Sequence, residues 1–471
     1  MATISSLGVG SSGLDVKSIV AQLVALEKAP LTKLQLDAAT AQTRVSAYGQ
    51  IKSLFSTLSD AASKLGSLTT FNAVTATSSN SATVSAAAIG GTAANSFSVK
   101  VDSLARAQST ASAALLPVGG ALGAGTLRLQ LGKWTVVPAS FTATVGVAPV
   151  DIVVSATDTV TDVASKINGA GAGVTATVLN DASGQRLLLR SSSTGEAAGF
   201  ELTVPTDADG NTGDAAGLSR LATGTSYIYG QDAKIQINDI PVTSSTNTFT
   251  DVVSGVTLTA GAESTTAVQV AVASDKSVVK TAVDDFVAAY NAINDLLNDA
   301  TKYDSATKKA GLLQGDPTAI GLQNALRGVL QSTTSGSAYG RLADIGVTQA
   351  LGGDLTVDSA KLATALANGS EVQKLFRTDN RNPLTNGVAL KLKSFAQGLL
   401  ATDGLFNSKD ASLKRTLDLN TKDQAAVNDK AARVEAALTR RYTALDVQLT
   451  SLTSLSAYVT QQVAQWNKST A

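Results

Sequence analysis

The strongest periodic signal in the sequence is an apolar seam near its C-terminal end. Its positions alternate steps of four and three residues: Leu438, Tyr442, Leu445, Leu449, Leu452, Ser456, Val459, Val463 and Trp466. This spacing is typical of one face of a coiled-coil helix, and only Ser456 interrupts it. Each large apolar side chain gains about 1.5–3 kcal/mol on leaving water. Another helix must therefore cover the seam, either within the chain or from another molecule.

A second apolar pattern lies near the other end of the chain, where residues 14–68 are rich in leucine and alanine at helical spacing. Ile19, Val20 and Leu23 are apolar near its start, and Tyr48, Ile51, Phe55, Leu58, Ala62 and Leu65 recur farther on. Asp15 is suited to cap this helix, and Pro30 predicts a break or restart. We predict that the two ends pair as a helical stem and that the residues between them form a β-rich head.

The middle of the chain, residues 70–275, changes to Thr, Ser, Val, Gly and Ala in period-two alternation, which predicts strands that share a core. The clearest strands are Phe97–Val101, Val174–Val178, Phe200–Val204, Lys234–Ile237 and Val268–Val272. A short helix is predicted over Thr159–Asn168, and loops are predicted around the glycines of 119–125 and over 207–217. The fold class is therefore α+β with several domains.

Residues 276–471 return to helical spacing. Phe286, Tyr290 and Ile293 lie on one predicted helical face with Val279 and Leu297. Asp316 followed by Pro317 predicts a further helix start, because aspartate caps helices and proline is favoured at the first helical position.

Composition excludes several classes of chemistry. The chain has no cysteine and no histidine, so it has no histidine-dependent catalytic triad, no histidine or thiolate metal site and no disulfide. Lysine plus arginine equals aspartate plus glutamate at 37 each, which argues against binding to nucleic acid or to an anionic membrane. The first thirty residues show no secretory signal pattern, and no apolar run predicts membrane insertion.

Three local patterns resemble known sites, and each has a simpler interpretation. Gly8, Gly10 and Gly13 have the spacing of a dinucleotide-binding loop, but no buried strand precedes them, which favours a flexible lead-in. Asp284 and Asp285 are neighbours on a predicted helix and point apart. The calcium-like series is Asp207, Asp209, Asn211 and Asp214, and it has threonine and leucine where a calcium loop needs glycine and glutamate. We expect no catalytic residue, metal or cofactor.

A series of motifs resembles one bacterial family from end to end. The motifs are Gly10-Ser11-Ser12-Gly13-Leu14-Asp15-Val16, Phe97-Ser98-Val99-Lys100-Val101, Lys166-Ile167-Asn168 through Gly184 to Leu187, Gly255-Val256-Thr257-Leu258, Phe286-Val287-x-x-Tyr290-Asn291, Gly315-Asp316 and Leu342-Ala343-Asp344-Ile345-Gly346. In this order they resemble the flagellar filament-capping family, hook-associated protein 2, and the third motif is similar to the "IN" motif of flagellar axial proteins.

The resemblance implies a nested architecture with two β-rich head domains, one inserted in the other. The implied ranges are a terminal coiled-coil leg (1–42 and 421–471), a helical domain (43–70 and 276–420), an inner β domain (71–109 and 223–275) and an outer β domain (110–222). The C-terminal seam with Ile19, Val20 and Leu23 would contact flagellin or other legs, whereas Tyr48, Ile51, Phe55, Leu58, Phe286, Tyr290 and Ile293 would form the seam of the helical domain.

The resemblance also implies a structural protein rather than an enzyme. Such a chain forms a homo-oligomer, usually a pentamer, at the distal tip of the flagellum, where it retains exported flagellin and promotes its insertion. Its partners would be other copies, flagellin and an export chaperone, and export would use the flagellar type III system without a cleaved signal. Alternatives are an adhesin that binds host mucin through residues 110–222, another flagellar axial protein, or a glycosidase with two acidic residues in one cleft.

Overall fold

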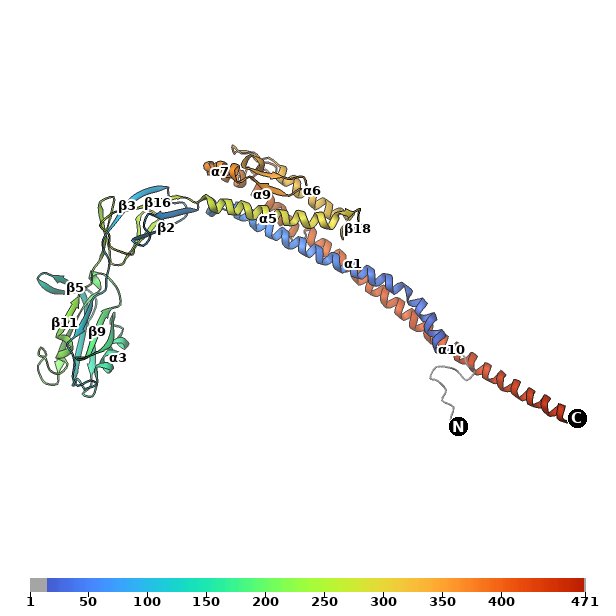
Figure 1. Ribbon diagram of the computed structural model, residues 1–471, viewed down its shortest axis with the longest axis horizontal. Coiled ribbons are helices and arrows are strands. Elements are labelled where there is room, and N and C mark those ends of the chain that lie inside the picture. Colours follow the sequence, from blue (N-terminus) through green and yellow to red (C-terminus); the bar gives the residue numbers. More distant parts are fainter. Residues whose placement is uncertain (1–14, 470–471) are drawn as a thin grey trace. The chain divides into compact units, whose positions relative to one another are not determined.

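The computed structural model describes residues 15–469 (Figure 1). The chain divides into two compact units. One unit joins the two ends of the chain, Met1–Thr70 with Val279–Ala471, and the other is the central segment Phe71–Val278. In the described part of the chain, no helix has both the length and the apolar composition needed to cross a bilayer.

The first unit begins with α1 (Val16–Leu65). Asp15 caps this helix as predicted, because its carboxylate accepts a hydrogen bond from the Ser18 amide at 2.9 Å. The predicted break at Pro30 was wrong, since the helix runs through this residue. Pro30 and Leu26, whose carbonyl the proline leaves without a donor, both lie on the exposed side of the helix, where water can satisfy that carbonyl.

The long helix α10 (Leu405–Ser469) lies beside α1, so the predicted pairing of the two chain ends is confirmed (Figure 1). The rest of this unit packs against the C-terminal half of α1 and the start of α10. It includes α5 (Lys276–Thr301), α6 (Pro317–Gln331), α7 (Ser359–Ala365), α8 (Gly369–Arg377) and α9 (Val388–Leu400), with the small hairpins β17 (Tyr303–Asp304) to β18 (Lys309–Ala310) and β19 (Val347–Gln349) to β20 (Leu355–Val357).

In the second unit, two sheets enclose one apolar core. A five-stranded sheet has the order β1 (Val74–Ser78), β16 (Val268–Ser274), β3 (Asn95–Ser103), β12 (Ala233–Ile237) and β13 (Ile240–Ser244). A three-stranded sheet has the order β14 (Thr248–Val253), β15 (Val256–Ala260) and β2 (Val84–Ala88). Alternate residues such as Val99, Val101 and Val270 point into this core, as the period-two pattern predicts.

Strands from the intervening sequence build a second core. One sheet has the order β10 (Gly199–Asp207), β5 (Gly125–Val136) and β6 (Ala139–Ala143), with β7 (Val150–Val154) also on β5. The other has the order β11 (Gly224–Ile228), β4 (Ser109–Ser112), β9 (Gly184–Ser191) and β8 (Val174–Asp181). The helix α3 (Val160–Ala170) buries Val163 and Ile167 in this core and begins with a capping box between Thr159 and Asp162.

The predicted α+β fold with several domains and a β-rich centre is confirmed. Each strand segment named from the sequence lies within a strand, and the predicted short helix corresponds to α3. Because all strands of the second core lie between β3 and β12 in the sequence, one set of sheets is inserted in the other. The domain ranges given above stay a prediction.

Candidate functional site

The stem formed by α1 and α10 is held by a narrow apolar contact near the start of α1. Val20, Val24 and Ala431 are buried there, and Val16, Leu438 and Tyr442 pack against them. An ion pair joins Glu27 and Lys430 across the two helices, with 2.9 Å between its oxygen and nitrogen. Small residues such as Ala431 let the two helices approach closely, but they bury little surface, so this end of the stem is only lightly stabilised.

Farther along the stem, a polar side chain lies in the contact between α1 and α10. The Asn420 side chain is only 9% exposed, and its amide donates to the backbone carbonyl of Leu34 at 2.9 Å. Gln424 donates to the Asn420 carbonyl oxygen at 2.6 Å. A buried asparagine in a coiled coil stabilises one register, because sliding the helices leaves its amide without partners. This pair therefore fixes how α1 and α10 align.

Beyond the paired section, α10 presents apolar side chains to solvent. Leu438, Tyr442 and Leu449 are partly covered, whereas Leu445 is 40% exposed and Leu452 is 60% exposed. Val459, Val463 and Trp466 are likewise exposed. The predicted C-terminal seam is therefore one stripe on one helix, and α1 covers only its first part.

The N-terminal members of the predicted leg surface lie on α1 at the start of the stem. Val20 is buried against α10, Ile19 is half-buried, and Leu23 faces solvent. Gly8, Gly10 and Gly13 lie outside the described residues. Leu455 is also exposed at the edge of this stripe, and Tyr458 is exposed farther around α10; the prediction from the sequence included neither. Their distance of three residues from Leu452 and Leu455 is the signal that could have found them.

The predicted seam of the helical domain is an interior core. Tyr48, Ile51, Phe55 and Leu58 on α1 and Phe286, Tyr290 and Ile293 on α5 are all buried. The Phe55 ring lies 5.5 Å from the ring of Phe406 and 6.0 Å from that of Phe395, measured between centroids. These residues hold α1, α9 and α10 together and are not available to a partner.

Asp316 links three helices where the stem meets this core. One carboxylate oxygen caps α6 by accepting from the Thr318 amide at 2.9 Å, and the other lies 2.9 Å from Lys409 Nζ on α10. Lys409 also lies 5.2 Å from the centre of the Tyr48 ring on α1. Burial raises the pKa of Asp316, but the hydrogen bonds from Lys409 and Thr318 outweigh it and hold this pKa below its ordinary value.

Replacing the Asp316 carboxylate is expected to lower the free energy of unfolding of the first unit. It should also reduce the change of this free energy with pH. Because the folded-state pKa of Asp316 lies below the unfolded value of about 3.9, its contribution is present above that value and is lost as pH falls through the folded-state pKa. Asp316→Asn keeps the cap but breaks the partly buried pair, so the free energy of unfolding at pH 7 should fall by about 1–3 kcal/mol. Urea unfolding at pH 7 and pH 3 measures both effects.

The matched control for this prediction is Asp299→Asn, which breaks an ion pair with Lys302 whose two side chains are exposed. The control should leave the free energy of unfolding nearly unchanged, because exposed pairs contribute little. An Asp316→Asn protein with the stability of the wild type at pH 7 would contradict the role assigned to the carboxylate.

The acidic loop after β10 uses its side chains to build turns. Asp207 accepts hydrogen bonds from the Ser219 amide at 2.9 Å and from its hydroxyl at 3.0 Å. Asp209 and Asp214 each accept from an amide two residues ahead. Among the described residues, no group of three or more acidic side chains is placed to hold a metal ion.

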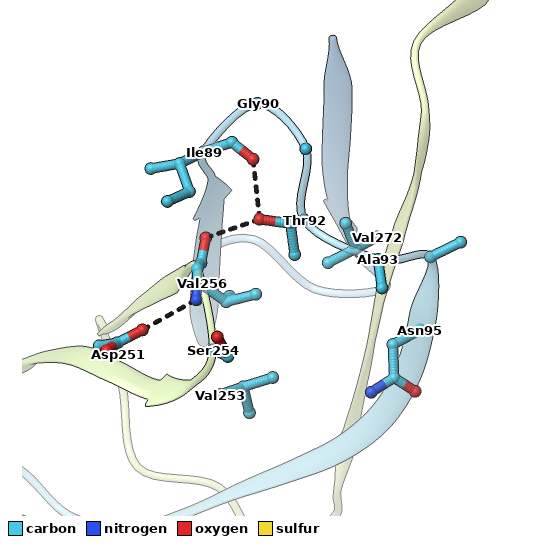
Figure 2. A pocket seen from close by; sticks show the side chains of 13 residues that line it. Ile89, Gly90, Thr92, Ala93, Asn95, Asp251, Val253, Ser254, Val256 and Val272 are labelled. Atoms are coloured by element: carbon cyan, nitrogen blue, oxygen red, sulfur yellow. Dashed lines mark hydrogen bonds between the residues drawn. The ribbon is translucent and has the colours of Figure 1, made fainter. Parts of the chain in front are cut away.

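A cleft in the second unit has a volume of about 700 Å³ and lies between residues 89–95 and the turn after β14 (Figure 2). Thr92 closes one side by donating to the carbonyls of Ile89 at 2.7 Å and Gly255 at 3.2 Å. Asp251 accepts from the Gly255 amide at 2.8 Å. Asp251 is the one titratable residue in the described lining, and this carboxylate serves the turn, so the cleft does not offer the paired acids that glycoside hydrolysis requires.

Comparison with known proteins identifies the family. Residues 12–108 match the family described as "Flagellar hook-associated protein 2 N-terminus", and residues 230–454 match its C-terminus. A flagellar hook-associated protein 2 of Escherichia coli K12 is 32% identical over 98% of both chains. The chain belongs to the flagellar hook-associated protein 2 family. The B-type flagellar hook-associated protein 2 of Pseudomonas aeruginosa is 28% identical over 98% of this chain and 97% of its own.

The fold agrees with a solved member of the flagellar hook-associated protein 2 family. The crystal structure of the flagellar cap protein FliD from Escherichia coli, comprising its D1, D2 and D3 domains, matches with a TM-score of 0.59 and 27% identity. The match covers 78% of this chain and 99% of that chain.

Residues 140–193 match the flagellin hook IN motif. This range includes Lys166 to Leu187, the residues whose sequence resembles that motif. The family is a structural family of the flagellum and not an enzyme family. A flagellar cap role, and with it a place at the filament tip, therefore has support from the family, and the exposed stripe of α10 is the feature of this chain best suited to such a role.

Proposed function

We propose that the chain caps the growing flagellar filament as a homo-oligomer, retains exported flagellin and promotes its insertion beneath the cap. The observation that carries this proposal is the apolar stripe of α10, which continues past the section covered by α1. A stripe of this kind suits the helices of another subunit, because apolar positions at heptad spacing pack against a second helix. Ser456 at one of these positions weakens the contact, which favours exchange as new subunits enter.

The finer parts of the proposal are expectations that membership of the family supports. The copies form a pentamer at the distal tip, each with its stem toward the filament and contacts to flagellin through Leu445, Leu449, Leu452, Val459 and Val463. The chain reaches the tip through the flagellar type III system, and an export chaperone covers its apolar stripe before export. Covering this stripe is physically useful, because exposed apolar surface promotes aggregation.

The experiment that tests the proposal is deletion of the gene in its bacterium. The culture medium is then assayed for unpolymerised flagellin, and filament length is measured by electron microscopy. Abundant soluble flagellin with absent or stunted filaments, both reversed by the wild-type gene, is the expected result. Filaments of normal length in the deletion strain would contradict the cap function.

Binding of host mucin is a second candidate function, and a group of aromatic side chains favours it. The ring centroid of Trp134 on β5 lies 5.2 Å from that of Phe141, 6.3 Å from that of Tyr227 and 5.8 Å from that of Tyr229. Tyr227 is exposed, and such rings offer an apolar face beside a polar hydroxyl. Binding of the full chain to immobilised mucin, lost in Tyr227→Ala, would support adhesion alongside capping.

A further inference from the structure

The hairpin of β19 and β20 ends in a tight turn that projects one leucine. The Ala350 amide donates to the Asp354 carbonyl at 2.7 Å, and the Gly353 amide donates to the Ala350 carbonyl at 2.9 Å. Leu351 occupies the tip with a relative exposure of 110%, and glycines follow it at 352 and 353. We call residues 350–353 the Leu351 turn.

Side chains from α5 hold the Leu351 turn in place. Asn294 and Asn298 each donate to the Gly352 carbonyl at 3.1 Å, and the buried Tyr290 hydroxyl donates to the Gly353 carbonyl at 3.0 Å. Gly353 has a φ of +96°, and a Cβ there would lie 2.6 Å from an Arg327 side-chain nitrogen.

A single exposed leucine on a mobile loop needs no explanation. A fully exposed leucine on a turn held by three side-chain hydrogen bonds, one of them buried, is different, because the protein has already ordered the loop that a partner would otherwise have to order. The Leu351 turn is therefore preorganised, which lowers the entropic cost of its contact with a partner.

The same unit carries an apolar groove of about 450 Å³ between α6, the residues before α9 and α9 itself. Val329, Leu384, Leu390 and Phe395 supply its apolar walls, and the small residues Ala325 and Gly328 leave room between them. Leu384 is 78% exposed at its rim. We call the hollow lined by these residues and by Lys391 the Lys391 groove.

Lys391 gives the groove a polar end. Its side chain is 8% exposed, and Nζ donates to the Ser332 hydroxyl at 2.9 Å and to the Thr333 carbonyl at 2.7 Å. An ammonium group has three N–H donors, so one remains for an acceptor in the groove. No carboxylate in the described part of the chain forms an ion pair with Lys391, and burial lowers the pKa of this ammonium.

The Leu351 turn and the Lys391 groove complement each other. The groove offers an apolar hollow beside an N–H donor, and the turn offers an aliphatic side chain beside backbone carbonyls. No described residue donates to the carbonyl of Leu351 itself. The two features lie on different elements of one unit, and hydrogen bonds from α5 hold the turn in place.

We propose that the Leu351 turn of one copy inserts into the Lys391 groove of a second copy, where Lys391 donates to a carbonyl of the turn. This inference rests on the self-association that the proposed function includes. The contact is heterologous, because each copy contributes a turn on one side and a groove on the other. Repetition of such a contact closes into a ring when the rotation between copies permits.

Sedimentation velocity of the purified full chain tests the proposal. Leu351→Asp and Leu384→Asp each place a charge in the contact, and each should weaken self-association about tenfold or more. Both leucines are exposed, so circular dichroism and the melting temperature should match those of the wild type. Leu419→Asp on α10 adds the same charge at an exposed leucine outside both features and should associate as the wild type does.

Mixing the two variants sharpens this test. The Leu351→Asp protein retains its groove and the Leu384→Asp protein retains its turn, so an equimolar mixture can form one intact contact. A one-to-one complex in the mixture, with no larger assembly, is the expected result. A monomeric wild type, normal self-association of Leu351→Asp, or a mixture without complexes would each overturn the inference.

The two proposals fail in different ways. A deletion strain without filaments, together with a Leu351→Asp protein that self-associates normally, would remove the turn-in-groove contact and leave the cap function standing. Normal filaments in the deletion strain would remove the cap function, whereas the sedimentation experiment would still decide the contact.

Discussion

Leu445→Asp combined with Leu452→Asp is expected to abolish capping, so that a deletion strain carrying this variant releases flagellin into the medium and grows few or no filaments. Both leucines lie on the exposed stripe of α10. Each substitution forfeits about 1.5–3 kcal/mol of burial against a partner helix and also places a carboxylate in that contact. Filament length by electron microscopy and soluble flagellin in the medium are the measurements.

A matched control adds the same charges to the other face of α10. Thr443→Asp and Ser454→Asp lie on the side opposite Leu449, since each helical residue advances by about 100°. This control should restore normal filaments. The β-rich unit should remain folded in both variants, which circular dichroism of the purified proteins checks. Normal filaments from the Leu445→Asp, Leu452→Asp strain would contradict the role of the stripe.

The second large effect concerns the core that joins stem and helical domain. Phe55 is fully buried, and its ring meets those of Phe395 and Phe406. Phe55→Ala removes these contacts and leaves a cavity, which should lower the free energy of unfolding by about 3–5 kcal/mol. Hydrogen exchange measured by mass spectrometry should show faster exchange in α1, α9 and the start of α10.

Phe249→Ala provides the reciprocal control, because Phe249 is buried in the first core of the β-rich unit. It should accelerate exchange in β14 and β15 and leave α1 unchanged. Equal loss of protection throughout the chain in both variants would show that the two units do not open separately, contrary to the expectation from their separate cores.

The sequence predicts the stem well because its signal is local. The C-terminal seam and the change to period-two alternation report directly on helices and strands, and pairing of the ends follows from the need to bury the seam. The α1 partner face is harder to read. Glu27, Leu34 and Ala41 occupy it with Val20 and Val24, so charged and small residues hide its heptad spacing. The break predicted at Pro30 was wrong because an exposed proline interrupts one hydrogen bond without ending the helix.

The proposed contact between copies could not be read from the sequence. Leu351 is one leucine among many, and its rigid exposure depends on hydrogen bonds from Asn294 and Asn298, more than fifty residues away. Lys391 likewise has the sequence pattern of an ordinary helical lysine, and only the packing of α6 and α9 shows that its ammonium is buried. Such features arise from tertiary structure, which local periodicity does not encode.

The continuity of α10 has a mechanical consequence. Its 65 residues form one helix of about 100 Å, which begins at the Phe406 contact and ends in the exposed stripe. The hydrogen bond of Asn420 to α1 opposes sliding of the two helices. A sideways force on the far end of α10 therefore acts as a torque about the section that is paired with α1. If the proposed function holds, a subunit that pushes against the stripe would strain the junction of Phe55, Phe406 and Lys409, and the stem would transmit this load to the core around Phe55.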